Sequence, residues 1–370
     1  MRKSQNQLRV LIAGGGTGGH IYPGIAIAKE LQRRHPHSQF LFVGTERGLE
    51  SRIVPNEGFR LERITVAGLK GMGGLRQLTN SMAIPKSLWE SCRILRRFRP
   101  SVVIGVGGYS SGPPVLMAVL MGIPAMLQEQ NALPGLTNRL LGQFVRRVAA
   151  GFQEATAYFG SKTVVTGNPV RSGFSKIQQP QESARFTLLI SGGSRGSQAI
   201  NQAVVDALQI MTPNLEKLHW IHQTGEQDHK MVLQAYQGAG ASADVRPFFN
   251  DMPEQFAKAH LLICRSGATT LAEITVAGKA ALLVPFPQAA DDHQRKNAEA
   301  LVRAGAAEML LQKDLDGSRL ADRIQYFFQN RDVLSRMENS SRGLGRPDAT
   351  ERIADLIEEL GERKSQLSTK

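Results

Sequence analysis

The stretch from residue 8 to residue 20, LRVLIAGGGTGGH, constrains the fold of this chain more than any other. An apolar, strand-like run stops there at five glycines around Thr17, and a helix is expected to begin near Ile21. Glycine costs folding entropy, so such a cluster indicates an unusual backbone shape or close approach of a ligand. A strand, a glycine turn and a helix N-terminus direct backbone N–H groups at an anion, with His20 at the mouth of the turn. Tight packing alone remains the other interpretation.

The spacing of this turn disfavours two common nucleotide sites. The chain contains no GxxxxGK[ST] phosphate loop. Gln39, Phe40 and Leu41 stand about 20 residues further on, where a dinucleotide-binding fold carries the acid that binds ribose. A nicotinamide dehydrogenase is therefore disfavoured.

The pattern along the chain predicts an α/β protein. A length of 370 residues with 41% hydrophobic content suits two globular domains, each with its own core. Apolar runs alternate with helix-length stretches, which predicts parallel sheets covered on both faces. We expect strands at 8–13, 39–43, 60–66, 101–106, 125–128, 148–151 and 163–166, and then at 186–190, 218–223, 243–247, 261–264, 281–284 and 308–311.

The second half opens as the first half does. After a pause at 167–171 and a polar, proline-bearing segment at 178–182, a strand runs into the turn SGGSRGS and a helix at 198–211. We therefore expect two similar domains, residues 1–170 and 171–346, that face one another across a cleft. A C-terminal helix at about 347–362 has one apolar face and could pack back on the first domain.

The net charge of +13 lies entirely in the first half. Residues 1–170 carry 21 basic and eight acidic side chains, whereas residues 171–370 carry 24 of each. This asymmetry points to an anionic partner for the first domain, either a nucleic acid or an acidic membrane surface. No aromatic platform or recognition motif for nucleic acid is evident. The apolar stretch 75–99, fringed by arginines and containing Trp89, is typical of a helix on an anionic membrane or of one packed on the sheet.

Other features bound the cellular setting. Cys92 and Cys264 are too few for a disulfide framework or a zinc site and fit a reducing compartment. The polar start of the chain shows no secretory signal, and the most apolar run, 113–127, is too short and broken to span a bilayer. We expect a soluble or peripheral protein.

Further polar and small-residue turns follow expected strands, at the edge where open α/β sheets bind ligands. The turn 192–197 offers N–H groups and hydroxyls to phosphate, although such turns are also packing devices. In 265–273 the helix start suits an anion and Glu273 suits sugar hydroxyls, while Thr270 with Glu273 also matches a capping box. The loop 285–297 is interpreted as hydrogen bonding rather than as a metal site.

Two more stretches of the first half complete the set. Residues 105–113 form a third glycine-rich turn after a strand, and Glu129, Gln130 and Asn131 follow the next strand. Glu129 is one of few acids in its half, and both a structural and a catalytic role stay open.

In this order, the motifs resemble those of the MurG family of peptidoglycan N-acetylglucosaminyltransferases. The matching stretches, from residue 10 to about residue 305, are GGGTGGHIYP, GVGGYSSGP, EQNALPGLTN, GNPVR, GGSRGS, CRSGATTLAE and VPFPQAADDHQRKNA. The resemblance implies a GT-B architecture of two Rossmann-like domains. It implies inverting transfer of N-acetylglucosamine from UDP-N-acetylglucosamine to lipid I, which is undecaprenyl-pyrophosphoryl-MurNAc-pentapeptide, giving lipid II and UDP.

The resemblance also implies a setting for this reaction. The first domain would receive lipid I at an anionic membrane surface, on the cytoplasmic face of the inner membrane, and the second would bind the UDP-sugar. No catalytic metal and no cofactor are implied, nucleic acid is not a partner, and cell-wall assembly proteins are conceivable partners.

Site residues follow by position from the resemblance. His20 is the candidate catalytic base, and Glu129 is either the alternative base or the partner of His20. The implied substrate-binding residues are Thr17, Gly18 and Gly19 in the first turn, Asn131 and Arg171 toward the donor, Ser194 at its pyrophosphate, Phe249 near its uracil, Ala268, Thr269, Thr270, Leu271, Ala272 and Glu273 at its phosphates and ribose, and Gln294 at its sugar hydroxyls. Two positions depart from the family pattern, because Arg195 replaces a polar amide and Gln128 stands where a histidine is frequent.

The chemistry of the residues agrees with this assignment. Inversion requires direct attack by the acceptor hydroxyl with help from a base, and histidine has the appropriate acid–base range. Two other classes remain as alternatives at this point: a UDP-sugar 2-epimerase on a similar fold, and a basic nucleic-acid-binding protein.

Overall fold

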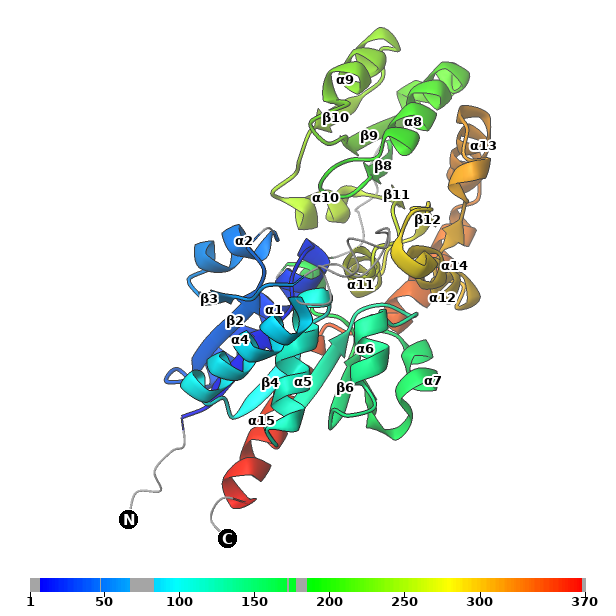
Figure 1. Ribbon diagram of the computed structural model, residues 1–370. Helices are drawn as coiled ribbons and strands as arrows, with labels where there is room; N and C mark the ends of the chain where they lie inside the picture. Colours follow the sequence, from blue (N-terminus) through cyan, green and yellow to red (C-terminus); the bar gives the residue numbers. More distant parts are fainter. Residues whose placement is uncertain (1–6, 47, 67–82, 172, 178–184, 368–370) are drawn as a thin grey trace. The chain divides into compact units, whose positions relative to one another are not determined.

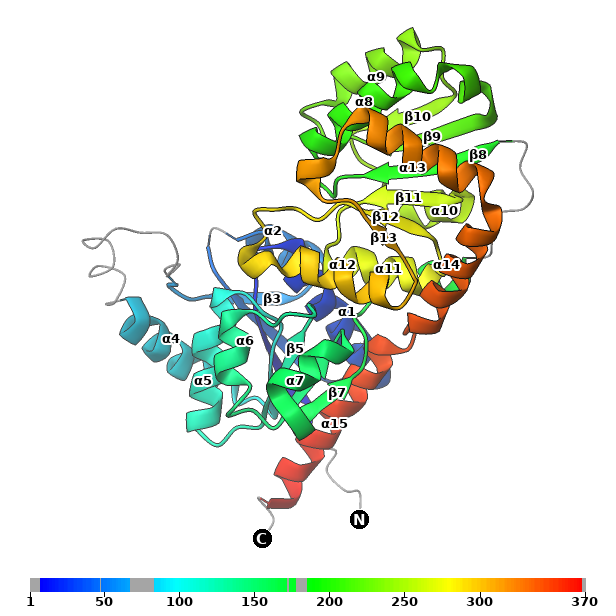
Figure 2. The same cartoon turned by 90° about the vertical axis from the view of Figure 1, so that its right-hand side faces the viewer.

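The computed structural model describes residues 7–46, 48–66, 83–171, 173–177 and 185–367. The chain divides into two compact units. The first comprises Met1–Val170 together with Asp348–Lys370, and the second comprises Arg171–Pro347. Each unit is built on one parallel sheet (Figures 1 and 2).

The first unit holds a seven-stranded sheet in the order β3-β2-β1-β4-β5-β6-β7. Its strands are β1 (Arg9–Ala13), β2 (Gln39–Gly44), β3 (Arg60–Arg63), β4 (Val102–Gly105), β5 (Ala125–Glu129), β6 (Arg147–Ala150) and β7 (Thr163–Val165). Its helices are α1 (Gly18–Arg34), α2 (Glu50–Asn56), α4 (Ala83–Phe98), α5 (Gly112–Leu120), α6 (Leu136–Leu141), α7 (Thr156–Phe159) and α15 (Ala349–Leu367). The strand order reverses between β1 and β4, and such a switch point is where open α/β sheets bind ligands.

Burial on both faces explains the apolar runs of the central strands, such as β1 and β4. Val10 and Ile12 of β1 belong to one core cluster, which also contains the inner faces of α1 and α15. Leu11 and Ala13 belong to a second cluster on the opposite face, with residues of α4 and α5. Parallel strands covered on both sides lose the alternation of polar and apolar residues.

The C-terminal helix α15 belongs to the first unit although it follows the second in sequence. Ile353, Ile357 and Leu360 are buried in the same cluster as Ile25 and Leu31 of α1. This apolar face therefore completes the core on one side of the first sheet.

The second unit holds a six-stranded sheet in the order β10-β9-β8-β11-β12-β13. Its strands are β8 (Phe186–Ser191), β9 (Leu218–Gln223), β10 (Ala243–Arg246), β11 (Leu261–Cys264), β12 (Ala281–Leu283) and β13 (Glu308–Met309). Its α-helices are α8 (Gln198–Ile210), α9 (His229–Gly238), α10 (Met252–Lys258), α11 (Ala268–Ala277), α12 (His293–Arg303), α13 (Gly317–Gln329) and α14 (Arg331–Leu344). The switch point here lies between β8 and β11.

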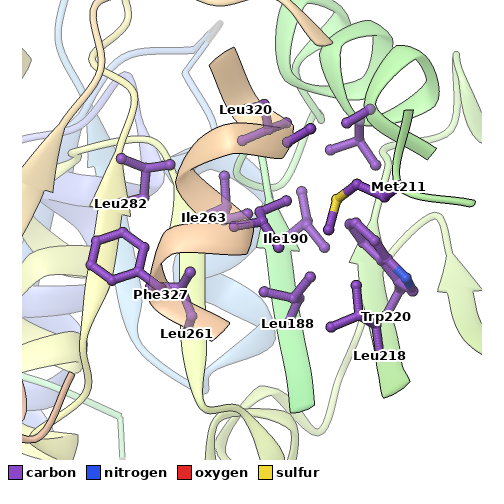
Figure 3. Packing of buried hydrophobic residues seen from close by; sticks show 14 of the residues in the cluster. Leu188, Ile190, Met211, Leu218, Trp220, Leu261, Ile263, Leu282, Leu320 and Phe327 are labelled. Atoms are coloured by element: carbon purple, nitrogen blue, oxygen red, sulfur yellow. The ribbon is translucent and has the colours of Figure 1, made fainter. Parts of the chain in front are cut away.

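The core of the second unit packs α13 against the central strands. Figure 3 shows Leu320 and Phe327 of α13 with Leu188 and Ile190 of β8, and Trp220 of β9 belongs to the same cluster. These aromatic and branched side chains pack α13 onto the sheet from which the loops of this unit extend.

The predicted α/β class is confirmed, and each predicted strand is present with ends shifted by up to three residues. The strand expected at 60–66 is the shorter β3, for example. The helix expected over 75–99 corresponds to α4, which spans Ala83–Phe98. Residues 75–82 lie outside the part of the chain that the structure describes. Among the described residues, no helix has the length and apolar character needed to cross a membrane.

Candidate active site

In the first unit, two glycine turns meet at the switch point. The turn after β1 and the turn after β4 are joined by a hydrogen bond from the backbone N–H of Gly15 to the carbonyl of Gly107, at 3.4 Å. Gly108 has a φ of +80°, and a Cβ at this position would lie 2.6 Å from the carbonyl oxygen of Gly15. Glycine is therefore required here by both conformation and space. The two turns act as one backbone platform.

Glu50, at the start of α2, holds this platform from behind. Its carboxylate is buried and accepts hydrogen bonds from the N–H of Gly16, the N–H of Thr45 and the hydroxyl of Thr45, each at 2.8 Å. A Cβ at Gly15, Gly44 or Gly48 would overlap the Glu50 side chain. Glu50 was not predicted from the sequence. The signal that could have indicated it is an acidic residue shortly after Gly44 and Gly48, beyond the end of β2.

The predicted residues Thr17, Gly18 and Gly19 form the start of α1. Thr17 is the exposed N-cap with an extended backbone, and its side chain makes no capping hydrogen bond. The first N–H groups of a helix have no acceptor within the helix and carry partial positive charge. This helix start can therefore bind an anionic or hydroxyl-bearing group.

His20 lies in the first turn of α1 and is half-buried. Its Nδ1 is 3.2 Å from Oε1 of Gln130, in the loop after β5. A Cβ on Gly107 would lie only 2.6 Å from the same nitrogen, so the second turn leaves room for the imidazole. Gln130 was quoted within a motif but given no role by sequence reasoning.

Glu129 is directed at its own loop. Its buried carboxylate accepts hydrogen bonds from the N–H of Asn131 at 2.9 Å, the N–H of Gly135 at 3.2 Å, and the side-chain amides of Asn131 at 3.2 Å and Asn138 at 2.8 Å. Burial raises the pKa of the Glu129 carboxyl, while these hydrogen bonds act in the opposite direction. This geometry favours a role in positioning Asn131 and the start of α6.

The second unit repeats this construction at its own switch point. Ser197 of the turn after β8 caps α8, because its hydroxyl accepts from the N–H of Ile200 at 3.4 Å. Gly196 has a φ of +76°, and a Cβ there would lie 1.9 Å from the carbonyl oxygen of Thr224. The predicted phosphate residue Ser194 is exposed in this turn.

Arg265 ties the loops of the second unit together, which sequence reasoning also missed. Its guanidinium donates to the Ser197 hydroxyl at 2.6 Å, to Gln312 at 2.7 Å and to the carbonyls of Val284 and Pro285 at 3.1 Å. Burial lowers its pKa to about 10, which leaves it a cation at neutral pH. A fixed positive charge therefore lies behind the turn 192–197.

The predicted donor stretch from Ala268 to Glu273 is the first part of α11. The alternative interpretation of Thr270 with Glu273 as a capping box is wrong, because the N-cap is Gly267 and Thr270 lies inside the helix. The helix α11 begins at Ala268, after Ser266 and Gly267, and therefore before the position that Thr270 would cap. The resulting helix start after β11 presents backbone N–H groups at the switch point.

Within α11, Ala268 and Leu271 are buried, whereas Thr269, Thr270 and Ala272 are partly exposed. Glu273 is buried and accepts a hydrogen bond from Nε of Arg171 at 2.8 Å. Burial raises the pKa of the Glu273 carboxyl, and the charge of Arg171 opposes that rise.

Of the other predicted donor residues, Asn131 lies in the first unit, whereas Gln294 lies in the first turn of α12 and Phe249 in the loop between β10 and α10. Gln294 is partly exposed, and its Oε1 accepts from the N–H of Phe286 at 3.0 Å. The side chain of Phe249 is buried, and the backbone N–H of Phe249 donates to Oε1 of Gln223 at 3.0 Å. The side chain of Phe248 is exposed. No group of three or more potential metal ligands occurs within the described parts of the chain.

Comparison with known proteins identifies the family. Residues 10–150 match the model of the glycosyltransferase family 28 N-terminal domain, and residues 187–360 match that of its C-terminal domain. A crystal structure of Acinetobacter baumannii MurG superposes with a TM-score of 0.81 at 32% identity, covering 95% of this chain and 99% of that one. The chain belongs to the MurG group of glycosyltransferase family 28. The expected GT-B fold and the expected enzyme class, a glycosyltransferase, are thereby confirmed.

Curated relatives are similar over nearly their whole length. A protein of Myxococcus xanthus is 48% identical over 95% of this chain and 93% of its own. A protein of Syntrophus aciditrophicus is 49% identical over 94% of this chain and 97% of its own. Both are named UDP-N-acetylglucosamine–N-acetylmuramyl-(pentapeptide) pyrophosphoryl-undecaprenol N-acetylglucosamine transferase. A UDP-GlcNAc 2-epimerase of Neisseria meningitidis shares the fold, with a TM-score of 0.65 and 15% identity. The superposition covers 95% of this chain and 100% of the epimerase.

Proposed function

We propose that this chain transfers N-acetylglucosamine from UDP-N-acetylglucosamine to the muramyl 4-hydroxyl of undecaprenyl-pyrophosphoryl-MurNAc-pentapeptide, with inversion, giving lipid II and UDP. The observation that carries the proposal is the near-full-length similarity to relatives that bear this activity in their names. The site supports it, because each unit presents glycine turns and helix starts at a switch point. The 2-epimerase alternative has only a likeness of fold in its favour.

The reaction needs one proton transfer. The acceptor oxygen forms a bond to the anomeric carbon while the bond from that carbon to the β-phosphate oxygen breaks, and UDP leaves with the electron pair. The hydroxyl proton must pass to a base, and we assign this role to Nε2 of His20. A neutral imidazole accepts such a proton near physiological pH. Glu129 then positions the Asn131 loop, in keeping with its four hydrogen bonds.

We assign the donor to the second unit. The turn 192–197 with Ser194, and the α11 start from Ala268 to Ala272, offer N–H groups to the diphosphate and stabilise the charge that develops on departing UDP. The Glu273 carboxylate, held by Arg171 at 2.8 Å, would accept hydrogen bonds from the ribose hydroxyls. The amide nitrogen of Gln294 would donate a hydrogen bond to a hydroxyl of the sugar. The segment that contains Phe249 would contact the uracil of UDP.

We assign the acceptor, and contact with an anionic membrane on the cytoplasmic face of the cell membrane, to the first unit. Lipid I keeps its pyrophosphate and its isoprenoid tail at the bilayer, so its enzyme must approach that surface. Five exposed apolar side chains on the adjacent helices α4 and α5 and at α6 support this assignment. We call them the apolar rim: Ile84, Trp89, Leu120, Leu140 and Phe144.

We propose that the two interpretations of the 75–99 stretch describe different parts of α4. Ile94, Leu95 and Phe98 are buried against the sheet, as expected of a packed helix. Trp89 is 62% exposed, with the Arg93 guanidinium 5.8 Å from its ring centre. The buried end anchors the helix, and the exposed end is available to lipid.

A transfer assay tests the proposed function. The purified chain, given radiolabelled UDP-N-acetylglucosamine and a lipid I analogue, should yield a labelled disaccharide lipid and UDP. Interconversion of the free UDP-sugar without lipid would instead indicate the epimerase. Absence of product, while an authentic MurG enzyme is active in parallel, would reject the proposal.

A further inference from the structure

Three buried side-chain amides stand in a row behind His20 in the first unit. Gln130, Gln128 and Asn168 are between 0% and 4% exposed. Nε2 of Gln130 donates to Oε1 of Gln128, and Nε2 of Gln128 donates to Oδ1 of Asn168 at 3.0 Å. Oε1 of Gln130 is 3.2 Å from Nδ1 of His20. We call Gln130, Gln128 and Asn168 the amide row.

The far end of the amide row is oriented by a backbone carbonyl. Nδ2 of Asn168 lies 2.8 Å from the carbonyl oxygen of Gln130, which can only accept a hydrogen bond. The amide nitrogen of Asn168 must therefore face that carbonyl, and its oxygen must face Gln128. Gln128 in turn presents its nitrogen to Asn168 and its oxygen to Gln130.

A second carbonyl orients the near end independently. Nε2 of Gln130 lies 2.8 Å from the carbonyl oxygen of Val106, in the turn after β4. The nitrogen of the Gln130 amide must therefore point at Val106, and its oxygen must point at His20. Both ends of the row give the same direction, so amide orientation here follows from the chemistry of the partners.

Only one state of a neutral imidazole fits this direction. An amide oxygen cannot donate, so Nδ1 of His20 must carry the proton, and the lone pair of the neutral ring then lies on Nε2. We propose that the amide row is a positioning device that holds His20 in the Nδ1–H tautomer. The proposal rests on the assignment of His20 as base, and it names Gln130, Gln128 and Asn168 as positioning residues.

The surrounding backbone leaves space for the row. A Cβ at Gly107 would lie 2.6 Å from Nδ1 of His20, and a Cβ at Gly151 would lie 2.4 Å from both polar atoms of the Asn168 amide. Free histidine in water favours the other tautomer, with the proton on Nε2, in which Nε2 cannot accept a proton. Holding the wrong tautomer in a serine protease triad costs about 10⁴-fold in rate.

The tautomer can be measured directly. Nitrogen NMR of the full chain labelled with ¹⁵N-histidine, with His20 assigned by loss of its signals in His20→Ala, should show a protonated Nδ1 and an unprotonated Nε2 at neutral pH. Gln130→Met should shift His20 toward the Nε2–H form and lower kcat roughly 10- to 100-fold, no more than the ~10²–10⁴-fold that general base catalysis contributes as a whole. The KM for UDP-N-acetylglucosamine should change less than about twofold, because the donor is assigned to the other unit.

Two variants separate the role of the row from its contribution to folding. Gln130→Glu keeps an acceptor oxygen toward Nδ1, so it should retain the Nδ1–H tautomer and recover part of the kcat lost in Gln130→Met. Gln255→Met makes the same substitution at a buried glutamine on α10 of the second unit, and it should leave the His20 spectrum unchanged.

The proposal is overturned if wild-type His20 carries its proton on Nε2, or if folded Gln130→Met keeps both the tautomer and kcat. Should Gln130→Met fail to fold, the wild-type spectrum and Gln130→Glu still decide the question. The base assignment fails separately, if His20→Ala keeps its kcat, and the spectrum then still decides whether the row sets the tautomer.

Discussion

At the scale of single residues, buried carboxylates in this protein hold backbone turns in place. Glu50 accepts three hydrogen bonds from the first glycine turn and the end of β2, and Glu129 accepts four from the loop that contains Asn131. Turns rich in glycine have little side-chain packing of their own, so the bracing must come from neighbouring segments. The shape of the site therefore depends on residues that need not touch a substrate.

Replacement of Glu50 by Gln tests this bracing. Either orientation of the new amide places an NH₂ group against the N–H of Gly16 or of Thr45, so one donor is left without an acceptor. We expect the free energy of unfolding of the first unit to fall by about 1–3 kcal/mol, and the KM for a lipid I analogue to rise. Urea unfolding and steady-state kinetics measure the two effects. Glu46→Gln, at an exposed position in the same segment, is the control, and equal behaviour of the two variants would contradict the bracing role.

At the scale of elements, the strands were predictable and the contacts between loops were not. The central strands of each sheet, such as β1 and β8, are short apolar runs, because burial on two faces leaves few polar positions, and this pattern is local in sequence. The glycine turns were found because each follows such a run. The capping box at Thr270 was wrong because α11 begins earlier, after Gly267. The contact of His20 with Gln130 joins residues 110 positions apart, which no local pattern reveals.

The element β9 carries a pH dependence of its own. His222 is fully buried, with Nε2 3.0 Å from Oδ1 of Asn201 and Nδ1 3.2 Å from the hydroxyl of Tyr236. Burial lowers its pKa to about 3. The unfolded chain takes up a proton below about pH 6.5 while the folded chain does not. The stability that this neutral histidine contributes is therefore complete above pH 6.5 and is lost progressively as the pH falls toward 3.

We expect the second unit to lose up to about 1.4 kcal/mol per pH unit through His222 below pH 6.5. His222→Gln should unfold more readily at pH 7 but with a smaller loss between pH 7 and pH 5. Part of the slope should remain, because burial also lowers the pKa of His260 to about 4. Fluorescence of Trp220, in a Trp89→Phe background, follows unfolding of this unit alone. An unchanged slope in the variant would refute the assignment to His222.

At the scale of the whole molecule, the excess basic charge and the most exposed large apolar side chains of the described residues lie in the same unit. The excess of basic residues lies within residues 1–170, and the apolar rim belongs to the same unit. A membrane surface attracts basic groups over distance and binds apolar side chains on contact. The sequence predicted the charge asymmetry and Trp89, whereas Leu140 and Phe144 became visible only with their exposure in the structure.

Vesicle binding tests the apolar rim. The chain should bind vesicles that contain phosphatidylglycerol more tightly than vesicles of phosphatidylcholine, and added salt should weaken that binding. Leu140→Ser with Phe144→Ser should reduce binding at least about tenfold in co-sedimentation, because burial of one such side chain contributes about 1.5–3 kcal/mol and about 1.4 kcal/mol is a factor of ten. Ile210→Ser, at an exposed apolar position of the second unit, should have no effect. Binding that resists the double substitution but disappears with Ile210→Ser would place the contact on the other unit.

The return of α15 to the first unit has a consequence for biosynthesis. Ile353, Ile357 and Leu360 fill one side of a core whose strands, from β1 to β6, were translated roughly 200 to 340 codons earlier. While the middle of the chain is being synthesised, only α1 of the two helices α1 and α15 is present on that side of the sheet, and the apolar surface that α15 later buries stays exposed. The helix α15 thus completes a core whose strands all precede the second unit in the sequence.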